Sequence, residues 1–316
     1  MNIPFVKACA LGNDFVIVID GIPFADELTC SLPSWRAPLG TWPSMYFPGL
    51  QQSCAPRNDE KNLSQSICKR YISDDQKELA TLSRKLADRR WGVGCDQVIY
   101  VRPTTDSHVY NIRFFNADGS EAEACGNGSR CVAKLLIQQH NLKKITLQTL
   151  GGILDCNLLD DGTVRIILPL PVCVKTIDLN HSAALFLSTV FVDIGNPHLV
   201  CFIDDVTVAQ KWGSILETYL PEIDSAMPPR VNVGFVKLLD RNTVLLSVWE
   251  RGAGFTEACG TGACAVAVAC HAQGLIDQVV HVNQKGGHLI VKVNEHNLLL
   301  QGEARLIYSG SIDLEV

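Results

Sequence analysis

Short apolar runs recur along the chain, and they predict strands. Nine of these runs are rich in β-branched residues: Phe15–Asp20, Val98–Arg102, Ile112–Phe115, Ile145–Thr149, Val164–Leu168, Val190–Val192, Leu199–Ile203, Val244–Trp249 and Leu289–Val293. Three longer segments carry a helical pattern instead. Asp74–Arg90 is amphipathic, Gly126–His140 follows a Cys-Gly pair, and Gly260–Gln273 is apolar on nearly all sides. The last pattern is typical of a helix that is buried all round.

The chain also repeats itself. The segment Glu123–Gly128 (EACGNG) recurs as Glu257–Gly262 (EACGTG), an offset of 259 − 125 = 134 between the two cysteines. Upstream, Gly12-Asn13 recurs as Gly195-Asn196, with an offset of 196 − 13 = 183. The difference, 183 − 134 = 49, indicates that the first copy carries about 49 extra residues. Two copies are too few for a solenoid, so the repeat predicts a protein of two lobes.

We therefore expect an α+β fold of two pseudo-symmetric lobes, with the active site in the cleft between them. Each lobe would be a curved mixed β-sheet or barrel wrapped around one central helix. Residues 1–168 would form the N-terminal lobe, completed by residues 303–316 or so, and residues 169–302 the C-terminal lobe. The extra segment, at about residues 22–74, holds six of the 14 prolines, which favours a decorated surface loop.

Composition narrows the class of protein. With 47% hydrophobic and 19% charged residues among 316, the chain fits neither a disordered nor a fibrous protein. A net charge of −6 without a basic patch argues against nucleic acid as a partner. The longest apolar runs fall short of the ~18 residues of a membrane helix, and the first residues lack a signal-peptide core. We therefore expect a cytoplasmic protein that does not bind membranes.

The 13 cysteines do not form an obvious disulfide framework or metal site. Their number is odd, C-x-x-C does not occur, and the chain is large. We therefore predict no bound metal. Six of the cysteines sit inside apolar runs and are expected to be buried as small hydrophobic residues: Cys131, Cys156, Cys173, Cys201, Cys264 and Cys270. The pattern Gly260–Ala265 also matches G-x-G-x-x-A, but a loop rather than a strand leads into it, which argues against a dinucleotide site.

Cys125 and Cys259 differ from the other cysteines because each precedes Gly-x-Gly at the start of a predicted helix. A helix N-terminus offers unpaired N–H groups and partial positive charge, so such a turn binds an anion such as a carboxylate. The same position is expected to lower the pKa of a cysteine below its usual value of about 8.5. Two such thiols on opposite lobes suit inversion of a carbon centre. One thiolate would remove a proton from one face and the other thiol would donate a proton to the opposite face.

Eight motifs together carry a resemblance to a known family. They are Ala10–Phe15 (ALGNDF), Gly92–Gln97 (GVGCDQ), Phe115–Glu121 (FNADGSE), Cys125–Cys131 (CGNGSRC), Gly195–His198 (GNPH), Arg230–Phe235 (RVNVGF), Glu250–Gly254 (ERGAG) and Cys259–Cys264 (CGTGAC). With these motifs the chain resembles the diaminopimelate epimerases, which are pyridoxal-phosphate-independent amino-acid epimerases. The resemblance covers nearly all of the chain outside the inserted segment.

The resemblance implies a role for individual residues. Cys125 and Cys259 would be the acid/base pair, with His198 close to them as a supporting residue. The remaining residues would bind substrate: Asn13, Gln97, Asn116, Gly126, Asn127, Asn196, Asn232, Glu250, Arg251, Gly260 and Thr261. A guanidinium and a carboxylate suit a substrate whose distal end carries both a carboxylate and an ammonium group. One departure is Phe255, which stands where the family usually has a glutamate.

The resemblance further implies an enzyme that interconverts LL- and meso-diaminopimelate, in the synthesis of lysine and peptidoglycan precursors, with no metal or organic cofactor. Its partner would be this small molecule, and a homodimer is possible. A racemase of another amino acid, of the histidine, glutamate or proline type, is the alternative. Two other classes stay open: an amino-acid-binding relative without catalysis, and a cysteine-based redox or metal protein.

Overall fold

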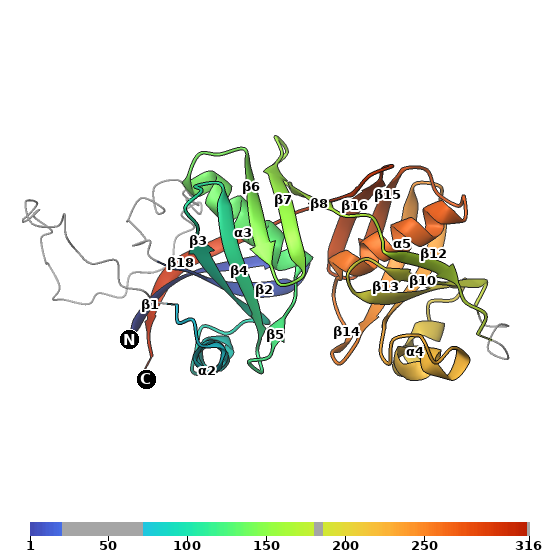
Figure 1. The fold of residues 1–316 in the computed structure, drawn as a ribbon, viewed down its shortest axis with the longest axis horizontal. Helices are drawn as coiled ribbons and strands as arrows, with labels where there is room; N and C mark the ends of the chain where they lie inside the picture. Colours follow the sequence, from blue (N-terminus) through green and yellow to red (C-terminus); the bar gives the residue numbers. More distant parts are fainter. Residues whose placement is uncertain (21–71, 180–185, 315–316) are drawn as a thin grey trace, which may run out of the picture.

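The computed structural model describes residues 1–20, 72–179 and 186–314. Most of the predicted insertion, at residues 22–74, therefore lies outside the described residues. The described residues form two lobes that lie side by side, each with one helix inside a curved sheet (Figure 1). None of the helices in these three ranges has the length and apolar character needed to cross a membrane.

The first lobe is a curved sheet around α3 (Gly126–Gln139). Its strands are β1 (Asn2–Ala10), β2 (Asn13–Ile19), β3 (Gln97–Pro103), β4 (Val109–Asn116), the short β5 (Glu121–Ala122), β6 (Lys144–Thr149), β7 (Gly152–Leu158), β8 (Val164–Leu168) and β18 (Arg305–Asp313). Neighbouring strands follow the order β18-β1-β2-β3-β4-β6-β7-β8. The pairs β2–β3 and β4–β6 are parallel and the others antiparallel, so the sheet is mixed.

The second lobe has the same strand order around α5 (Gly260–Ala272). Its strands are β9 (Cys173–Thr176), β10 (Ser188–Asp193), β11 (Pro197–Phe202), β12 (Asn232–Asp240), β13 (Thr243–Glu250), the short β14 (Gly254–Phe255), β15 (Val279–Gln284), β16 (Gly287–Val293) and β17 (Leu298–Gly302). They pair in the order β9-β10-β11-β12-β13-β15-β16-β17, with β11–β12 and β13–β15 parallel. The repeat in the sequence is thus a repeat of a whole lobe.

The strands β8 and β17 pair with each other and join the two lobes into one sheet. At the two ends of this sheet, β18 and β9 each pair with one neighbour within the described ranges, so the sheet stays open. The α+β fold expected from the sequence is confirmed, but its barrel form is wrong. An eight-stranded closed barrel has an interior just wide enough for side chains, whereas each sheet here must enclose a whole helix.

Two further helices cover the outer faces of the sheets. The predicted helix Asp74–Arg90 is observed as α2 (Gln76–Ala87), where the side chain of Asp75 accepts a hydrogen bond from Lys77 N–H and caps the first turn. The second is α4 (Val208–Ile223), which the sequence did not predict. Its residues Gly213 and Pro221 are typical helix breakers, but a Cβ at Gly213 would lie 2.7 Å from the Trp249 ring. Packing against tryptophan therefore requires the glycine.

One apolar side chain of the first lobe lies in the core of the second. Leu11, at the turn between β1 and β2, is 2% exposed and packs within the cluster that surrounds α5. Its φ of 53° is in the left-handed region, which leucine seldom adopts. Gly286 faces it so closely that a Cβ there would lie 2.0 Å from the Leu11 carbonyl oxygen. The two lobes therefore share a hydrophobic contact as well as a sheet.

Candidate active site

The two central helices begin at the junction of the lobes, each with a cysteine as its N-cap. Cys125 Sγ accepts a hydrogen bond from Gly128 N–H at 3.3 Å, and Cys259 Sγ accepts one from Gly262 N–H at 3.3 Å. The first residues of the helices face each other, because a Cβ on Gly126 would lie 3.9 Å from the Gly260 Cα. Helical N–H groups from both lobes thus meet at one place.

Burial dominates the acidity of both thiols. It raises the pKa of Cys125 to about 11, although the hydrogen bond from Gly128 N–H acts in the opposite direction. Burial also raises the pKa of Cys259 well above its usual range, and the nearby Glu250 carboxylate raises both. The sequence-based expectation of lowered pKa values is therefore wrong for this site without substrate. Removal of the thiols from water outweighs the helix N-termini.

In the first lobe, the predicted polar residues form two hydrogen-bonded pairs. Asn127 Nδ2 donates to Asn13 Oδ1 at 2.8 Å, and also to the carbonyl oxygen of Ala258 in the other lobe at 3.3 Å. Gln97 Nε2 donates to Asn116 Oδ1 at 2.8 Å across the β3–β4 pair. Gln97 Oε1 is buried and has no hydrogen-bond partner among the described residues, so it remains available as an acceptor.

In the second lobe, a chain of contacts leads from a histidine to Cys259. His198 Nε2 lies 3.2 Å from Asn196 Oδ1, and Asn196 Nδ2 donates to Thr261 Oγ1 at 3.2 Å. Thr261 Oγ1 lies 3.4 Å from Cys259 Sγ. Burial, with a smaller contribution from the Arg251 charge, lowers the pKa of His198 to about 3. The imidazole is therefore neutral at physiological pH.

Three further predicted residues border the second turn. Asn232 Oδ1 accepts a hydrogen bond from Arg251 N–H at 3.0 Å. Burial raises the pKa of Glu250, while hydrogen bonds from Thr256 and from the Cys259 thiol act against this shift. The side chain of Arg251 is exposed. A carboxylate next to a thiol and an exposed guanidinium on the following residue can receive the opposite charges of an amino acid.

The structure also shows residues that sequence reasoning missed. Gln284, at the end of β15, accepts a hydrogen bond from Cys259 N–H at 2.8 Å, and its buried Nε2 has no partner among the residues described. Arg130, inside the Cys125–Cys131 motif, is fully buried. No sequence signal marks Gln284, because its position follows only from the strand pairing. No sequence signal marks Arg130 as buried either, because Asn127 and Lys134, one turn to either side of it, are also polar.

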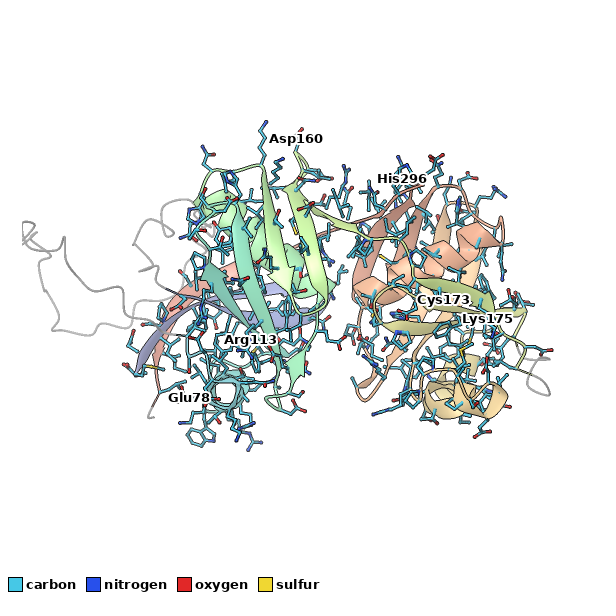
Figure 2. The ribbon with its side chains drawn as sticks, viewed as in Figure 1. Glu78, Arg113, Asp160, Cys173, Lys175 and His296 are labelled. Atoms are coloured by element: carbon cyan, nitrogen blue, oxygen red, sulfur yellow. The ribbon has the colours of Figure 1, made fainter. Side chains whose placement is uncertain are left out.

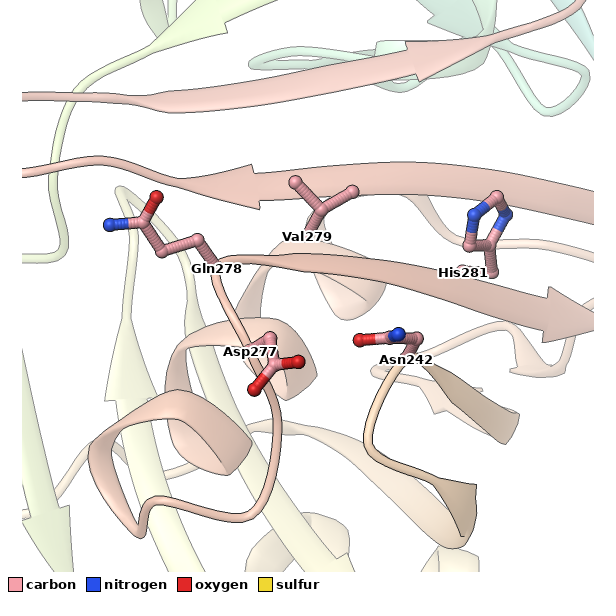
Figure 3. A pocket seen from close by; sticks show the side chains of 5 residues that line it. All are labelled: Asn242, Asp277, Gln278, Val279 and His281. Carbon is pink, nitrogen blue, oxygen red and sulfur yellow. The ribbon is translucent and has the colours of Figure 1, made fainter.

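Two surface features lie away from the cysteines. Cys173 is exposed on β9, the edge strand of the second lobe, where Figure 2 shows it close to Lys175. The expectation that it is buried is wrong, because β9 lies at the end of the sheet. A surface pocket is lined by Asn242, Asp277, Gln278, Val279 and His281 (Figure 3). The Asp277 carboxylate there is paired with Arg241 at 2.9 Å, and the pocket holds none of the predicted site residues.

The sequence comparisons agree on one family. The family pattern described as diaminopimelate epimerase matches residues 71–168 and 190–307. A diaminopimelate epimerase of Sphingopyxis alaskensis is 38% identical over 247 residues, which cover 72% of this chain and 85% of that protein. Another, from Acinetobacter baumannii, is 37% identical over 255 residues, or 75% of this chain and 89% of that protein.

Solved structures with much lower identity share the fold. A phenazine biosynthesis protein of the PhzF family from Bacillus anthracis superposes with a TM-score of 0.63 at 14% identity, covering 99% of this chain and 100% of that one. A hydroxyproline epimerase from Agrobacterium vitis gives 0.58 at 12% identity, covering 98% and 92%. These two support only the architecture. The match of the family pattern and the relatives above 30% identity show more: this chain belongs to the diaminopimelate epimerase family of isomerases.

Proposed function

We propose that this protein interconverts LL- and meso-2,6-diaminopimelate by inversion at one α-carbon. The observation that carries the proposal is the pair of thiols, Cys125 and Cys259, each capping a buried helix where the two lobes meet. Inversion requires a base on one face of the carbon and an acid on the other. A C–H bond breaks as one thiolate takes the proton, and a new C–H bond forms with the proton of the other thiol.

The surrounding groups supply what this chemistry needs. The α-carboxylate would accept hydrogen bonds from N–H groups of Gly126-Asn127 and Gly260-Thr261, which also stabilise the carbanion. An ammonium group of the substrate would pair with Glu250 and cancel the negative charge that raises the pKa of both thiols. Thiolate formation would thus accompany substrate binding.

The other predicted residues would hold the rest of the substrate. Arg251 is exposed and would bind the distal carboxylate. The amide side chains would supply neutral donors and acceptors, and neutral His198 would orient Asn196 beside Thr261. The amides concerned are Asn13, Gln97, Asn116, Asn196 and Asn232. No step in this scheme uses a metal or an organic cofactor.

The test is incubation with LL-diaminopimelate in deuterated water. We expect the meso form to appear with one deuterium at the inverted α-carbon, as measured by NMR and mass spectrometry. Proline, glutamate and histidine, offered in parallel, test the alternative of a different racemase. Turnover of one of these without turnover of diaminopimelate would refute the proposal.

The same proposal includes three properties of the whole protein: its lobe boundaries, its location and its oligomeric state. We place the lobe boundaries near residues 168 and 302, the enzyme in the cytoplasm, and two copies in a homodimer. Analytical ultracentrifugation measures the last of these directly, and a single species at the monomer mass would contradict it.

A further inference from the structure

Arg130 is a fully buried arginine on α3, one turn after Gly126, the first residue of that helix. Its guanidinium donates to the Gly126 carbonyl at 3.2 Å, to Asn127 Oδ1 at 2.7 Å and to the Glu303 carbonyl at 3.3 Å. Within the described ranges it forms no salt bridge with a carboxylate, and the Glu303 carboxylate pairs with Arg305 instead. A buried charge without a counter-ion is costly and requires an explanation.

The position of the guanidinium is central to the junction of the lobes. One of its terminal nitrogens lies 4.0 Å from the Cβ position of both Gly126 and Gly260, the first residues of the two central helices. On its other side it packs against Gly302 of β17, where a Cβ would lie 3.2 Å from its Nε. One side chain from the first lobe thus contacts the cysteine turns of both lobes.

The repeat explains why there is a single arginine. With the offset of 134 residues, the second-lobe equivalent of Arg130 is Cys264 (130 + 134 = 264). Cys264 is small, apolar and fully buried. Two guanidinium groups this close to the junction would repel each other without counter-ions. The pseudo-symmetry is therefore broken at this position, and the single charge is carried by the helix that begins after Cys125.

A hydrogen-bond relay connects this side chain to the second turn. Arg130 holds Asn127 Oδ1, which directs Asn127 Nδ2 toward Asn13 and toward the carbonyl oxygen of Ala258. Ala258 directly precedes Cys259. Removal of the guanidinium would leave the Asn127 amide free to rotate, and would release both its contacts.

We propose that Arg130 is a positioning residue for the reaction, which holds the two cysteine turns in register and supplies positive charge to the anion that forms between them. The inference rests on the proposed epimerisation. It implies that the thiolate forms more readily on Cys125 than on Cys259. The Arg130 charge also acts to lower the pKa of Cys125, against the larger effect of burial.

The test combines kinetics with thiol reactivity. Alkylation of Cys125 and Cys259 by iodoacetamide is followed separately by peptide mapping, from about pH 6 to about pH 11. The midpoint of each thiol is defined as the pH at which its alkylation rate equals half of the rate of wild-type Cys125 at about pH 10, because the rate rises in proportion to the thiolate fraction. In Arg130→Met we expect the midpoint for Cys125 to move up by about one pH unit or more, and kcat to fall about 100-fold. Arg130→Lys should restore the Cys125 midpoint but not kcat, because an ammonium group lacks the planar fork.

Lys134→Met is the matched control. Lys134 lies one turn further along α3 and donates to the carbonyl oxygens of Gly162 and Ala304 at 3.1 and 2.8 Å. Its loss should lower the melting temperature without moving either midpoint. If Arg130→Met behaves in the same way, with an unchanged midpoint and kcat, the side chain is only a structural support and the proposal is wrong.

If Arg130→Met does not fold, the order in which the two thiols of the wild-type protein are alkylated provides a second test. Cys125 must then react at lower pH than Cys259, and the reverse order would overturn the inference. Because alkylation needs no turnover, the outcome is separate from that of the proposed function. If the wild-type protein fails to epimerise diaminopimelate, but the Cys125 midpoint still shifts in Arg130→Met, only the proposed function is refuted.

Discussion

At the scale of single residues, the proposed acid/base pair consists of two thiols that accept hydrogen bonds from helical N–H groups. Cys125 and Cys259 occupy equivalent places, yet their surroundings differ, with an asparagine after Cys125-Gly126 and a threonine after Cys259-Gly260. Burial keeps both thiols protonated in the absence of substrate. The two cysteines should therefore be individually indispensable but chemically distinct.

Replacement of either cysteine by alanine should stop epimerisation. We expect Cys125→Ala and Cys259→Ala each to lose about 1,000-fold or more in kcat, because one face of the α-carbon then lacks its acid or base. Both variants should fold, since alanine fits where a thiol did. Circular dichroism verifies the folding, and conversion of LL- to meso-diaminopimelate measures the loss.

Cys264→Ala is the control for these two variants, because Cys264 is buried on α5 but lies outside the proposed acid/base pair. It should keep most of the activity. Near wild-type turnover in Cys125→Ala or Cys259→Ala would eliminate the two-base mechanism.

A second prediction at this scale concerns the acid side of the stability profile. Burial alone would raise the pKa of Asp14, but hydrogen bonds from Arg89 and Lys7 lower it from 3.8 to about 2. A carboxyl with a depressed pKa stabilises the fold above its unfolded value and loses this contribution as pH falls through the folded value. Asp14→Asn should therefore lower the free energy of unfolding by roughly 1–2 kcal/mol at neutral pH. This is less than the full effect of the pKa shift, because Arg89 is largely exposed and solvent weakens its ion pair with Asp14.

This difference should shrink as the pH falls from about 4 to about 2, as measured by urea unfolding at each pH. Asp160, which Figure 2 shows at the tip of the first lobe, is exposed and provides the control variant Asp160→Asn. A constant difference between Asp14→Asn and wild type over this range would mean that the ion pairs of Asp14 do not stabilise the fold.

At the scale of secondary structure, local contacts decide which elements the sequence reveals. The helices α3 and α5 were predictable because each follows a cysteine turn that recurs with a fixed offset. The helix α4 was not, because Gly213 serves the Trp249 ring and Pro221 falls in the last turns. The strand β18 was not predicted either. Exposed and less exposed side chains do not alternate regularly along it, and its partner β1 lies about 300 residues away in the sequence.

The candidate site shows the same limit. Its motif residues could be named from the resemblance, and hydrogen bonds connect Asn13, Asn127, Asn196 and Thr261 at the two cysteine turns. The burial of Cys259 and the partial burial of Cys125 could not be predicted, because both depend on how closely the lobes approach. Nor could the roles of Gln284 and Arg130, since their partners lie on strands distant in sequence.

The turn between β1 and β2 supplies a prediction at this scale. Leu11→Ala should destabilise the protein by about 2–4 kcal/mol, because it removes a buried side chain from the core around α5. Leu150→Ala, on the hairpin between β6 and β7, is the control because Leu150 is 66% exposed. Thermal unfolding measures both. Equal melting temperatures of the two variants would show that Leu11 does not hold the lobes together.

At the scale of the whole molecule, the described fold is complete without residues 21–71. The two ends of this segment meet at one side chain, because Arg102 is paired with both Asp20 and Asp74 and also donates to the Ile72 carbonyl oxygen at 3.0 Å. The second lobe has no counterpart of the segment. A short connection between these ends should therefore suffice.

Replacement of residues 21–71 by a short Gly/Ser linker should leave the fold intact and epimerase activity within about 10-fold of wild type, since loop closure costs change slowly with length. Circular dichroism and the deuterium-exchange assay measure the two properties. A shortened protein that folds but fails to bind diaminopimelate would assign the segment to the active site. In a control variant, residues 21–71 are replaced by a scrambled sequence of the same length. It shows whether a loss of activity comes from the sequence of the segment or from its length.

The pairing of β18 with β1 also has a consequence for biosynthesis. During translation β1 emerges before its outer neighbour β18, which follows only after the entire second lobe has been made. Until then the β1 edge has free N–H and C=O groups, which can pair with another nascent chain. The second lobe has all its strands in one continuous stretch from β9 to β17 and can mature on the ribosome. Completion of the first lobe, whose central helix begins after Cys125, therefore waits until β18 has been made.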